Sequence, residues 1–221
     1  MEQQQELLQM FRTAIQCNVC FEDSGLSRGH IKVAHPRPIG PRYLASLMKI
    51  LVLMINPGKG RSDQDHRDGE TRLRAFANGQ ALIEEVFHSQ RVDFHNWGRG
   101  RFLSFYEGLG LDLDEVALVN LAWCSEMHDK HPAWMLNQCL KRHTAPLLQA
   151  LNPDVILLSG GDLQAFTHQL AAICPKARIL PTLHFSNRES RDFVEGQGQL
   201  IRAELNAIRS AKAVERRNQE K

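Results

Sequence analysis

The chain has 221 residues, and its 43% apolar and 24% charged residues are the proportions of a soluble globular protein with an ordinary core. Its 27 Lys and Arg nearly balance its 25 Asp and Glu, which gives a formal net charge of +2. This balance excludes a nucleic-acid binder that depends on a strongly basic tail, although it leaves room for a local basic groove.

No stretch of the sequence reaches the roughly 18 consecutive apolar residues of a membrane-spanning helix, and the polar N-terminal segment has no secretory core. We therefore expect a cytoplasmic protein with no membrane partner. Stable disulfides are rare in that compartment, so five cysteines, an odd number, do not indicate a disulfide framework. Metal binding, a metal cluster and simple core packing are the three open explanations.

Apolar periodicity and turn residues predict an alternation of helices and strands along the chain. Helical spacing predicts helices at 2–15, within 71–88, and at 102–109, 134–151, 162–173 and 191–214. Short apolar runs predict strands at 50–55, 115–121, 155–158 and 178–180, and the polar residues 59–70 predict a loop. This alternation is typical of a three-layer α/β/α sandwich with a central, mainly parallel four-stranded sheet. We expect a single domain over 1–221, with a frayed tail at 215–221.

Three polar motifs follow predicted strands. The segment NPG (56–58) ends the first strand, Asn120 ends the second, and HFS (184–186) lies in the loop after the last one. In parallel sheets, ligands bind at the carboxyl ends of the strands. The three motifs therefore mark the predicted binding edge of the sheet.

These motifs, in this order, resemble the uracil-DNA glycosylase superfamily. The segment MINPGKG (54–60) is similar to the NPG motif of the mismatch-specific and single-strand-selective branches. VNLAWC (119–124) resembles the strand end whose Asn reads a pyrimidine, and HFSNR (184–188) resembles the motif on the opposite side of the pocket. The resemblance covers about residues 15–205. It implies the three-layer fold and an enzyme that flips a base out of DNA and hydrolyses its N-glycosidic bond.

Four of the five cysteines have the layout of the iron–sulfur, family 4-like uracil-DNA glycosylases. Cys17 and Cys20 form a CxxC pair before the first motif, and Cys124 and Cys139 are separated by fourteen residues after the second. The resemblance implies a structural [4Fe–4S] cluster held by these four thiolates, which would also fasten the N-terminal segment 1–43. Cys174 falls outside the set and is expected in the core. Zinc bound by the same four residues, or cysteines that only fill the core, remain alternatives.

The resemblance also assigns roles at the base. Asn56 would position the attacking water, and it stands where faster members of the superfamily carry Asp. His184 would donate to the base carbonyl oxygen on which charge accumulates, and Asn120 can present both a donor and an acceptor to a pyrimidine edge. Phe76 would stack on the base, or pack in the core as an ordinary Phe. Gly58 leaves space near the C5 edge of the base, where strict uracil enzymes carry a bulky aromatic.

DNA contacts are assigned to the third motif. Ser186 would bind a phosphate beside the flipped nucleotide, and Asn187 and Arg188 could enter the groove or the gap left in the duplex. The basic and aromatic stretch 91–101 could contact phosphates or stack on bases, or could be a solvated loop with one buried Trp. The loop 125–132 has two His beside two acids, but its position between cysteines favours a solvent-exposed loop over a metal site.

The sequence thus predicts a monomeric, monofunctional DNA glycosylase, because the motifs place no lysine as an amine nucleophile. The target is uracil or a 5-substituted or hypermodified pyrimidine, and its removal leaves an abasic site in base excision repair or in defence against modified foreign DNA. One alternative is a catalytically weak or inactive DNA-binding protein that retains the fold, which Met54 and Asn56 favour. Another is a zinc-containing nucleic-acid-binding module, which the parallel sheet disfavours.

Overall fold

The chain packs into two compact units in the computed structural model, which describes residues 2–22, 24–29, 31–57, 63–128, 131–186 and 191–219. The first unit consists of Met1–Pro38, Met54–Arg91 and Val119–Leu151, and the second of Ile39–Leu53, Val92–Leu118 and Asn152–Lys221. Each unit therefore combines three stretches that are far apart in the sequence. The single domain expected over 1–221 stays a prediction.

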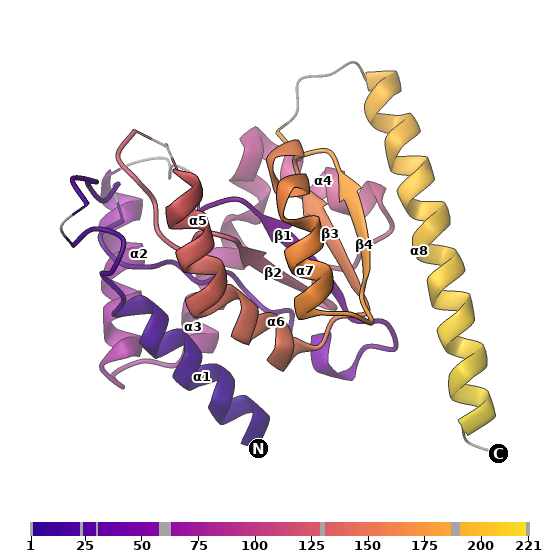
Figure 1. Cartoon of the computed structure of the whole chain (residues 1–221), viewed down its shortest axis with the longest axis horizontal. Coiled ribbons are helices and arrows are strands. Elements are labelled where there is room, and N and C mark those ends of the chain that lie inside the picture. The colour runs from indigo at the N-terminus through magenta and orange to yellow at the C-terminus, as the bar shows by residue number, and fades with distance from the viewer. Residues whose placement is uncertain are drawn as a thin grey trace. The chain divides into compact units, whose positions relative to one another are not determined.

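Four parallel strands form the central sheet, in the order β2-β1-β3-β4 (Figure 1). They are β1 (Ile50–Met54), β2 (Val116–Asn120), β3 (Val155–Ser159) and β4 (Arg178–Thr182). Every residue of the first three strands is buried. Strands that are covered on both faces read as continuous apolar runs rather than as alternating ones, which is why the sequence located them well. The predicted three-layer α/β/α class with a parallel four-stranded sheet is confirmed.

Helices make up most of the rest of the described chain. The α-helices are α1 (Glu2–Ile15), α2 (Asp63–Ala77), α3 (Ile83–Val92), α4 (Arg101–Gly108), α5 (Ala133–Cys139), α6 (Ala145–Leu151), α7 (Thr167–Ile173) and α8 (Arg191–Gln219). Short 3₁₀ helices lie at Tyr43–Ala45, Asp93–Gly100 and Gly161–Phe166, and a π-helix lies at Leu140–Thr144. Among the described residues, no helix combines the length and the apolarity needed to cross a membrane.

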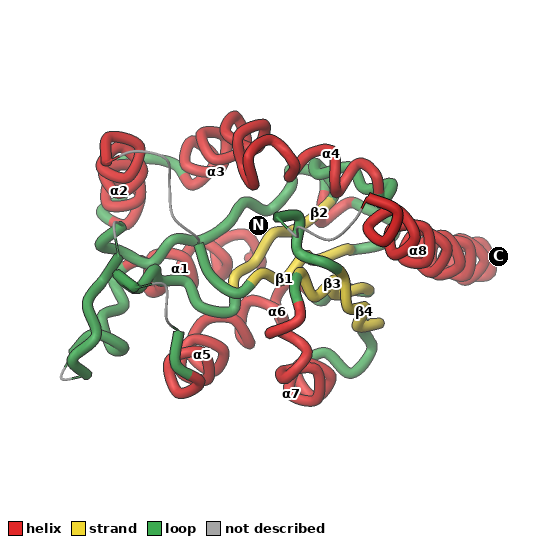
Figure 2. The backbone as a smooth tube through the Cα atoms, turned by 90° about the horizontal axis from the view of Figure 1, so that it is seen from above, coloured by secondary structure: helices red, strands yellow, loops and turns green. Residues whose placement is uncertain are grey.

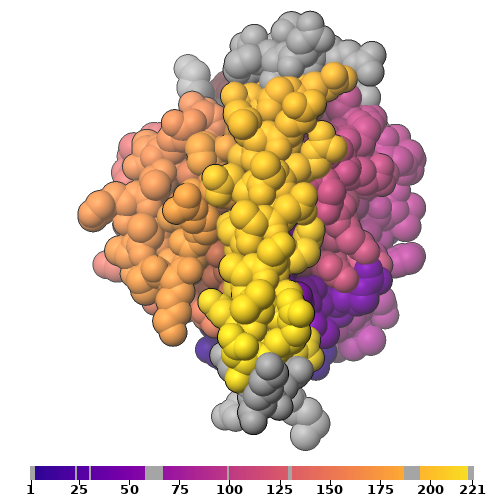
Figure 3. Space-filling model, turned by 90° about the vertical axis from the view of Figure 1, so that its right-hand side faces the viewer, coloured from indigo at the N-terminus to yellow at the C-terminus, as the bar shows by residue number. Residues whose placement is uncertain are grey.

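Helices cover both faces of the strands in the second unit. α4 lies on one face and α7 on the opposite face (Figure 2), and each contributes buried side chains such as Phe102 and Leu170. α8 is a long rod beside β4 (Figure 3), where Ile201 and Leu205 are buried. These layers bury every residue of β3, whereas β4 keeps Arg178 and Pro181 exposed.

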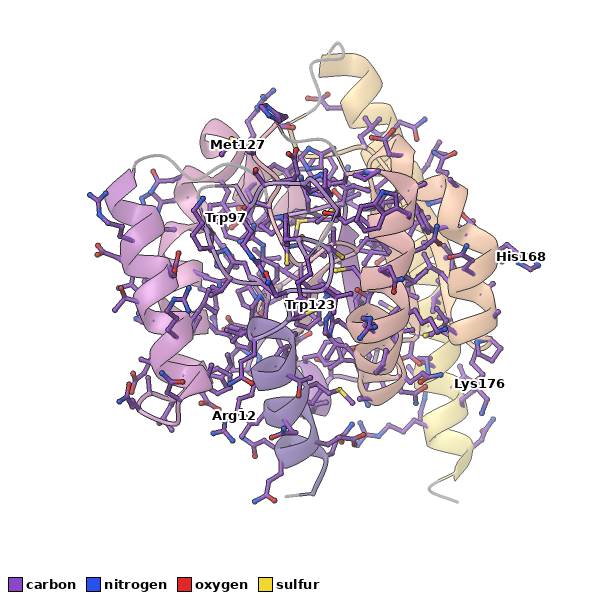
Figure 4. All side chains as sticks on the ribbon, turned by 60° about the vertical axis from the view of Figure 1, so that its left-hand side comes forward. Arg12, Trp97, Trp123, Met127, His168 and Lys176 are labelled. Carbon is purple, nitrogen blue, oxygen red and sulfur yellow. The ribbon has the colours of Figure 1, made fainter. Side chains whose placement is uncertain are left out.

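Aromatic packing around α1 forms the core of the first unit. Phe11 packs against Phe87 of α3, with ring centroids 5.4 Å apart, and against Trp123, with centroids 5.9 Å apart. Figure 4 shows Trp123 in the interior, near the C-terminal end of α1. Leu7 and Ile15 are buried with Phe11, so one face of α1 packs into the core of the first unit.

The loop predicted for 59–70 was wrong from Asp63 onward, because α2 begins there. Its described part buries Leu73 and Phe76 on one narrow face, while Glu70 and Arg74, one turn apart, form an ion pair of 2.7 Å on the surface. Since most of its residues are polar, the hydrophobic pattern indicated a loop. The two buried side chains and the ion pair between Glu70 and Arg74 stabilise a helix instead.

The helix predicted within 71–88 is also divided in two. α2 ends before Gly79, whose φ of +75° is a conformation that favours glycine at the end of a helix. α3 then starts at Ile83. The helix predicted at 134–151 is continuous in direction but contains the π-helical turn, which apolar spacing does not reveal.

Candidate functional site

Two asparagines meet at the carboxyl ends of β1 and β2. The pairing of these segments continues past the strands, since the Leu121 N–H donates to the Met54 carbonyl oxygen at 2.7 Å. The side chain of Asn120 is only 2% exposed. In the amide orientation that gives both side-chain atoms a partner, the Asn120 side-chain nitrogen donates to the backbone carbonyl oxygen of Asn56 at 3.2 Å. Two of the predicted site residues are therefore brought together in the first unit.

Arg37 is the first site residue that the sequence did not reveal. In the same amide orientation, the Nε of Arg37 donates to the Asn120 side-chain oxygen at 3.2 Å, and its Nη2 donates to the Pro57 carbonyl oxygen. Burial lowers the pKa of Arg37 to about 9, so the guanidinium is still charged at neutral pH. It thus links the NPG motif to the end of β2. A single Arg between two prolines gives no sequence pattern that would predict this position.

His131 is the second site residue that the sequence did not reveal. Its Nδ1 lies 3.2 Å from the side-chain nitrogen of Asn56, and its Nε2 lies 3.2 Å from the Cys124 carbonyl oxygen. The solvent-exposed loop expected at 125–132 was wrong for Ser125 and Glu126, which are 8% and 4% exposed. Part of the loop is therefore folded into the first unit.

The four cysteines of the predicted cluster belong to the first unit, whereas Cys174 lies buried in the second. All are free thiols, and of the four only Cys17 is partly exposed. A hydrogen bond from Cys139 lowers the pKa of Cys20 to about 7. Burial is the main cause that raises the pKa of Cys124 to about 11; Arg28 acts in the opposite direction, and the charges of Cys17 and Cys20 add to the increase. The four thiols, from two distant segments, thus interact with one another.

N–H donors point at the cysteine segments. Arg28 donates through Nη1 to the Cys124 sulfur at 3.5 Å and through Nη2 to the Cys17 carbonyl oxygen at 2.6 Å. The backbone N–H of Trp123 donates to the Cys139 sulfur at 3.4 Å. Across the described ranges, no three His, Cys, Asp or Glu side chains form a group that could hold a metal ion. A [4Fe–4S] cluster binds each thiolate to a different iron, and hydrogen bonds to sulfur tune it. That these four cysteines hold such a cluster stays a prediction.

A π-helical turn connects the cysteine helix to the end of β2. Residues 140–144 follow Cys139 directly, and such turns are frequent at functional sites. Thr144 is fully buried, and its hydroxyl oxygen accepts from the Trp123 indole N–H at 2.9 Å. The same hydroxyl donates to the carbonyl oxygens of Asn120 and the next residue, each at 3.1 Å. The turn thereby clamps the strand end that carries Asn120.

His184 lies in the second unit and forms a local network with Ser186. Its Nδ1 accepts from the Ser186 backbone N–H at 3.2 Å and lies 2.6 Å from the Ser186 hydroxyl. Because an accepting ring nitrogen carries no proton, the neutral ring has its proton on Nε2. Burial lowers the pKa of His184, which favours this neutral form. His184 therefore offers a neutral N–H donor at Nε2, while its role at a base and the phosphate contact of Ser186 stay predictions.

Aromatic rings support the loop that carries His184. The ring centroid of Phe185 lies 5.0 Å from that of Phe102, and the centroid of Trp97 lies 4.9 Å from Phe102. Gly98 permits this packing, because a Cβ at that position would lie 2.4 Å from the Phe185 ring. Within the stretch 91–101, Phe94 is buried and Trp97 packs against Phe102, while the contacts of this stretch with DNA stay a prediction.

The remaining predicted site residues are less informative. Phe76 is 1% exposed, and the Arg12 guanidinium lies 5.3 Å from the centroid of its ring. This is the packing of a core Phe, so its stacking on a base stays a prediction. Gly58, Asn187 and Arg188 lie outside the described residues.

Comparison with known proteins found no relative: the chain matches no protein-family model and no curated protein. What it does must therefore be inferred from its own residues.

Proposed function

We propose that the chain is a monofunctional DNA glycosylase that hydrolyses the N-glycosidic bond of a flipped pyrimidine. The observation that carries the proposal is the pair of asparagines, Asn56 and Asn120, held side by side at the ends of two parallel strands. Ligands of parallel sheets bind at this edge. Amide side chains supply both donors and acceptors without a charge, which suits a neutral base and a water molecule.

Each side chain has one task in the proposed reaction. The Asn56 amide oxygen accepts a hydrogen bond from water and orients it toward C1′ of the sugar. Asn120 pairs with the edge of the pyrimidine. From its sequence motif alone, His184 is expected to donate its Nε2–H to the base oxygen that gains negative charge. The bond from C1′ to the base breaks, the water oxygen binds C1′, and the water proton ends on the departing base. The products are the free base and an abasic site.

Asn56 also sets an expectation for the rate. An amide orients water but does not remove its proton, so this site lacks the general base that a carboxylate would supply. We expect a slow enzyme for this reason. Donation by a neutral His184 also stabilises the leaving base without requiring an acidic ring.

A structural [4Fe–4S] cluster completes the proposal, with Cys17, Cys20, Cys124 and Cys139 as its ligands. When bound, it would supply a rigid cross-link between the N-terminal segment and the segment that follows β2. The residues themselves prepare the site, because Arg28 and the Trp123 N–H already donate to two of the sulfurs. The enzyme would act as a monomer on single- or double-stranded DNA, in base excision repair or in defence against modified foreign DNA.

The proposed substrates are uracil and pyrimidines with a substituent at C5. The expectation of a roomy C5 edge comes from Gly58, where a bulky aromatic would exclude larger bases. Excision of 5-substituted uracils or modified cytosines would support this part of the proposal. Excision of uracil alone would restrict the substrate to uracil.

The test is base release from oligonucleotides that carry uracil, 5-substituted uracils or modified cytosines. Abasic sites are detected as strand breaks after alkali, and DNA binding is measured in parallel by gel shift. We expect Asn56→Ala and His184→Ala to lose base release but retain binding, and the control Asn78→Ala, at an exposed residue just after α2, to remain fully active. Binding by the wild type with no alkali-sensitive sites on any substrate would reject the glycosylase and favour the DNA-binding alternative.

A further inference from the structure

We propose that His131 is a positioning residue that orients the side chain of Asn56, and that it acts from the loop between two cysteines. The inference rests on the proposed function of Asn56. The Asn56 amide nitrogen lies 3.2 Å from the Nδ1 and 3.4 Å from the Nε2 of the His131 ring, and the Cys124 carbonyl oxygen lies 3.2 Å from the same Nε2. One ring therefore bridges the first polar motif and a cysteine of the predicted cluster.

The chemistry of the two partners determines the direction of both hydrogen bonds. The carbonyl oxygen of Cys124 can only accept, so the Nε2 of His131 carries the proton. The Nδ1 of the neutral ring then has a lone pair, which accepts from the amide N–H of Asn56. Because the amide nitrogen faces His131, the amide oxygen is directed to the other side. That oxygen is the atom proposed to orient the water.

Backbone pairing holds the loop in place. The Met127 N–H donates to the Ser27 carbonyl oxygen at 3.0 Å, and the Gly29 N–H donates to the Ser125 carbonyl oxygen at 2.9 Å. These bonds join the segment after the CxxC pair to the segment after Cys124. On its other side, the loop continues through Pro132 into α5, which ends at Cys139. The backbone at Ser125 and Met127 is thus held against the segment after the CxxC pair, and His131 lies two residues before α5, the helix that ends at Cys139.

This arrangement gives the cysteine segments a role in the geometry of the reaction. A hydrogen-bond acceptor at His131 selects one of the two possible orientations of the Asn56 amide. Without it, the amide can rotate by half a turn and present its nitrogen to the water. The rate of bond cleavage should then fall, whereas the binding of DNA should not change.

Three variants of the full chain test the role. His131→Leu removes both hydrogen bonds, and His131→Gln replaces the ring by an amide that can donate to the Cys124 carbonyl oxygen and accept from Asn56. His128→Leu is the matched control, since it makes the same change at an exposed His of the same loop. For each protein, kcat and KM are measured on the best oligonucleotide substrate, together with the iron and acid-labile sulfide per chain.

We expect kcat of His131→Leu to fall about tenfold, the effect of one lost hydrogen bond, with KM and iron content unchanged. His131→Gln should recover most of the rate, and His128→Leu should equal the wild type. An unchanged kcat in His131→Leu overturns the proposal. The proposal is also overturned if kcat falls together with the iron content and His131→Gln does not restore it. That result would indicate that His131 has only a structural role.

A parallel Asn56→Ala measurement separates this inference from the proposed function. If Asn56→Ala is inactive and His131→Leu fully active, the glycosylase proposal stands and the role of His131 fails. If the wild type releases no base, the proposed function fails first. The hydrogen bonds of His131 can also be tested without an activity measurement, by ¹⁵N NMR of histidine-labelled protein. A proton on Nε2 of His131 supports it, and a proton on Nδ1 overturns it.

Discussion

The substitution Gly98→Ala probes how the loop of His184 is held. Gly98 has a φ of +58°, and a Cβ built on it would lie 2.4 and 2.7 Å from two carbons of the Phe185 ring. These are carbons of a ring packed against Phe102. The ring cannot give way without repacking. Phe185 in turn stacks on His184, with ring centroids 4.1 Å apart. A methyl group at residue 98 therefore displaces Phe185, and this displacement reaches the ring of His184, which is predicted to be catalytic.

The expected loss of stability has two parts. An L-residue in the left-handed region costs about 1–2 kcal/mol, and overpacking of a filled core adds about 1–3 kcal/mol. Gly98→Ala should therefore lower the free energy of unfolding by about 2–5 kcal/mol. Gly110→Ala is a matched control, because Gly110 has a φ of +74° and no atom within 4 Å of the added Cβ. It should show only the backbone part, about 1–2 kcal/mol.

The assay is equilibrium urea unfolding followed by circular dichroism, with the same cofactor content in all samples. We expect the midpoint to fall further for Gly98→Ala than for Gly110→Ala, and base release to fall in Gly98→Ala alone. Equal midpoints for the two variants would refute the contact between residue 98 and Phe185. A destabilised Gly98→Ala with full activity would show that this contact does not position His184.

Three further predictions concern the first unit. Thr144→Val leaves the buried Trp123 indole N–H without its acceptor and should lower the free energy of unfolding by about 1–3 kcal/mol in urea unfolding; a change within about 0.5 kcal/mol would contradict the clamp. Burial lowers the pKa of His143 from 6.5 to about 4, so the folded chain binds fewer protons than the unfolded chain between these values. Its contribution to stability is then present above pH 6.5 and lost as the pH falls toward 4, by at most about 3 kcal/mol. His143→Phe should remove this part of the acid destabilisation in unfolding at pH 7.5 and 4.5, and an unchanged pH dependence would contradict the shift. Arg28 lowers the pKa of the Cys124 thiol; Arg28→Met should therefore raise it and reduce the iron bound per chain at pH 6 more than at pH 8, whereas an equal reduction at both would exclude this electrostatic effect.

The strands were predictable because local composition and tertiary environment agree there. Ile50–Met54 and Val155–Ser159 are continuous apolar runs, and the structure buries every one of their residues. A strand of this kind needs no knowledge of its neighbours to be recognised. α2 shows the opposite case, because its helix is stabilised by two buried side chains and surface ion pairing that a hydrophobic average conceals. An element can be predicted from the sequence when its local composition and its tertiary environment favour the same structure, and it is missed when they differ.

The polar part of the site was half predictable for a similar reason. Asn56 and Asn120 each follow a strand, so the sheet alone places them at one edge. Arg37 and His131 lie in irregular segments, and only the folded chain brings them to those asparagines. No local pattern encodes such a contact, because loop residues are positioned by partners that are distant in sequence.

Trp123 connects the helix that ends at Cys139 to the end of β2. It lies directly before Cys124, and its three polar or aromatic groups each have a different partner. Its backbone N–H donates to the Cys139 sulfur, its indole N–H donates to Thr144, and its ring packs on Phe11. Thr144 is five positions after Cys139, and a π-turn, which bonds residues five apart, can place both against one Trp. The irregular turn is therefore not a defect of the helix. The π-turn places Cys139 and Thr144 so that Trp123 alone contacts both, and it thereby holds α5 against the end of β2.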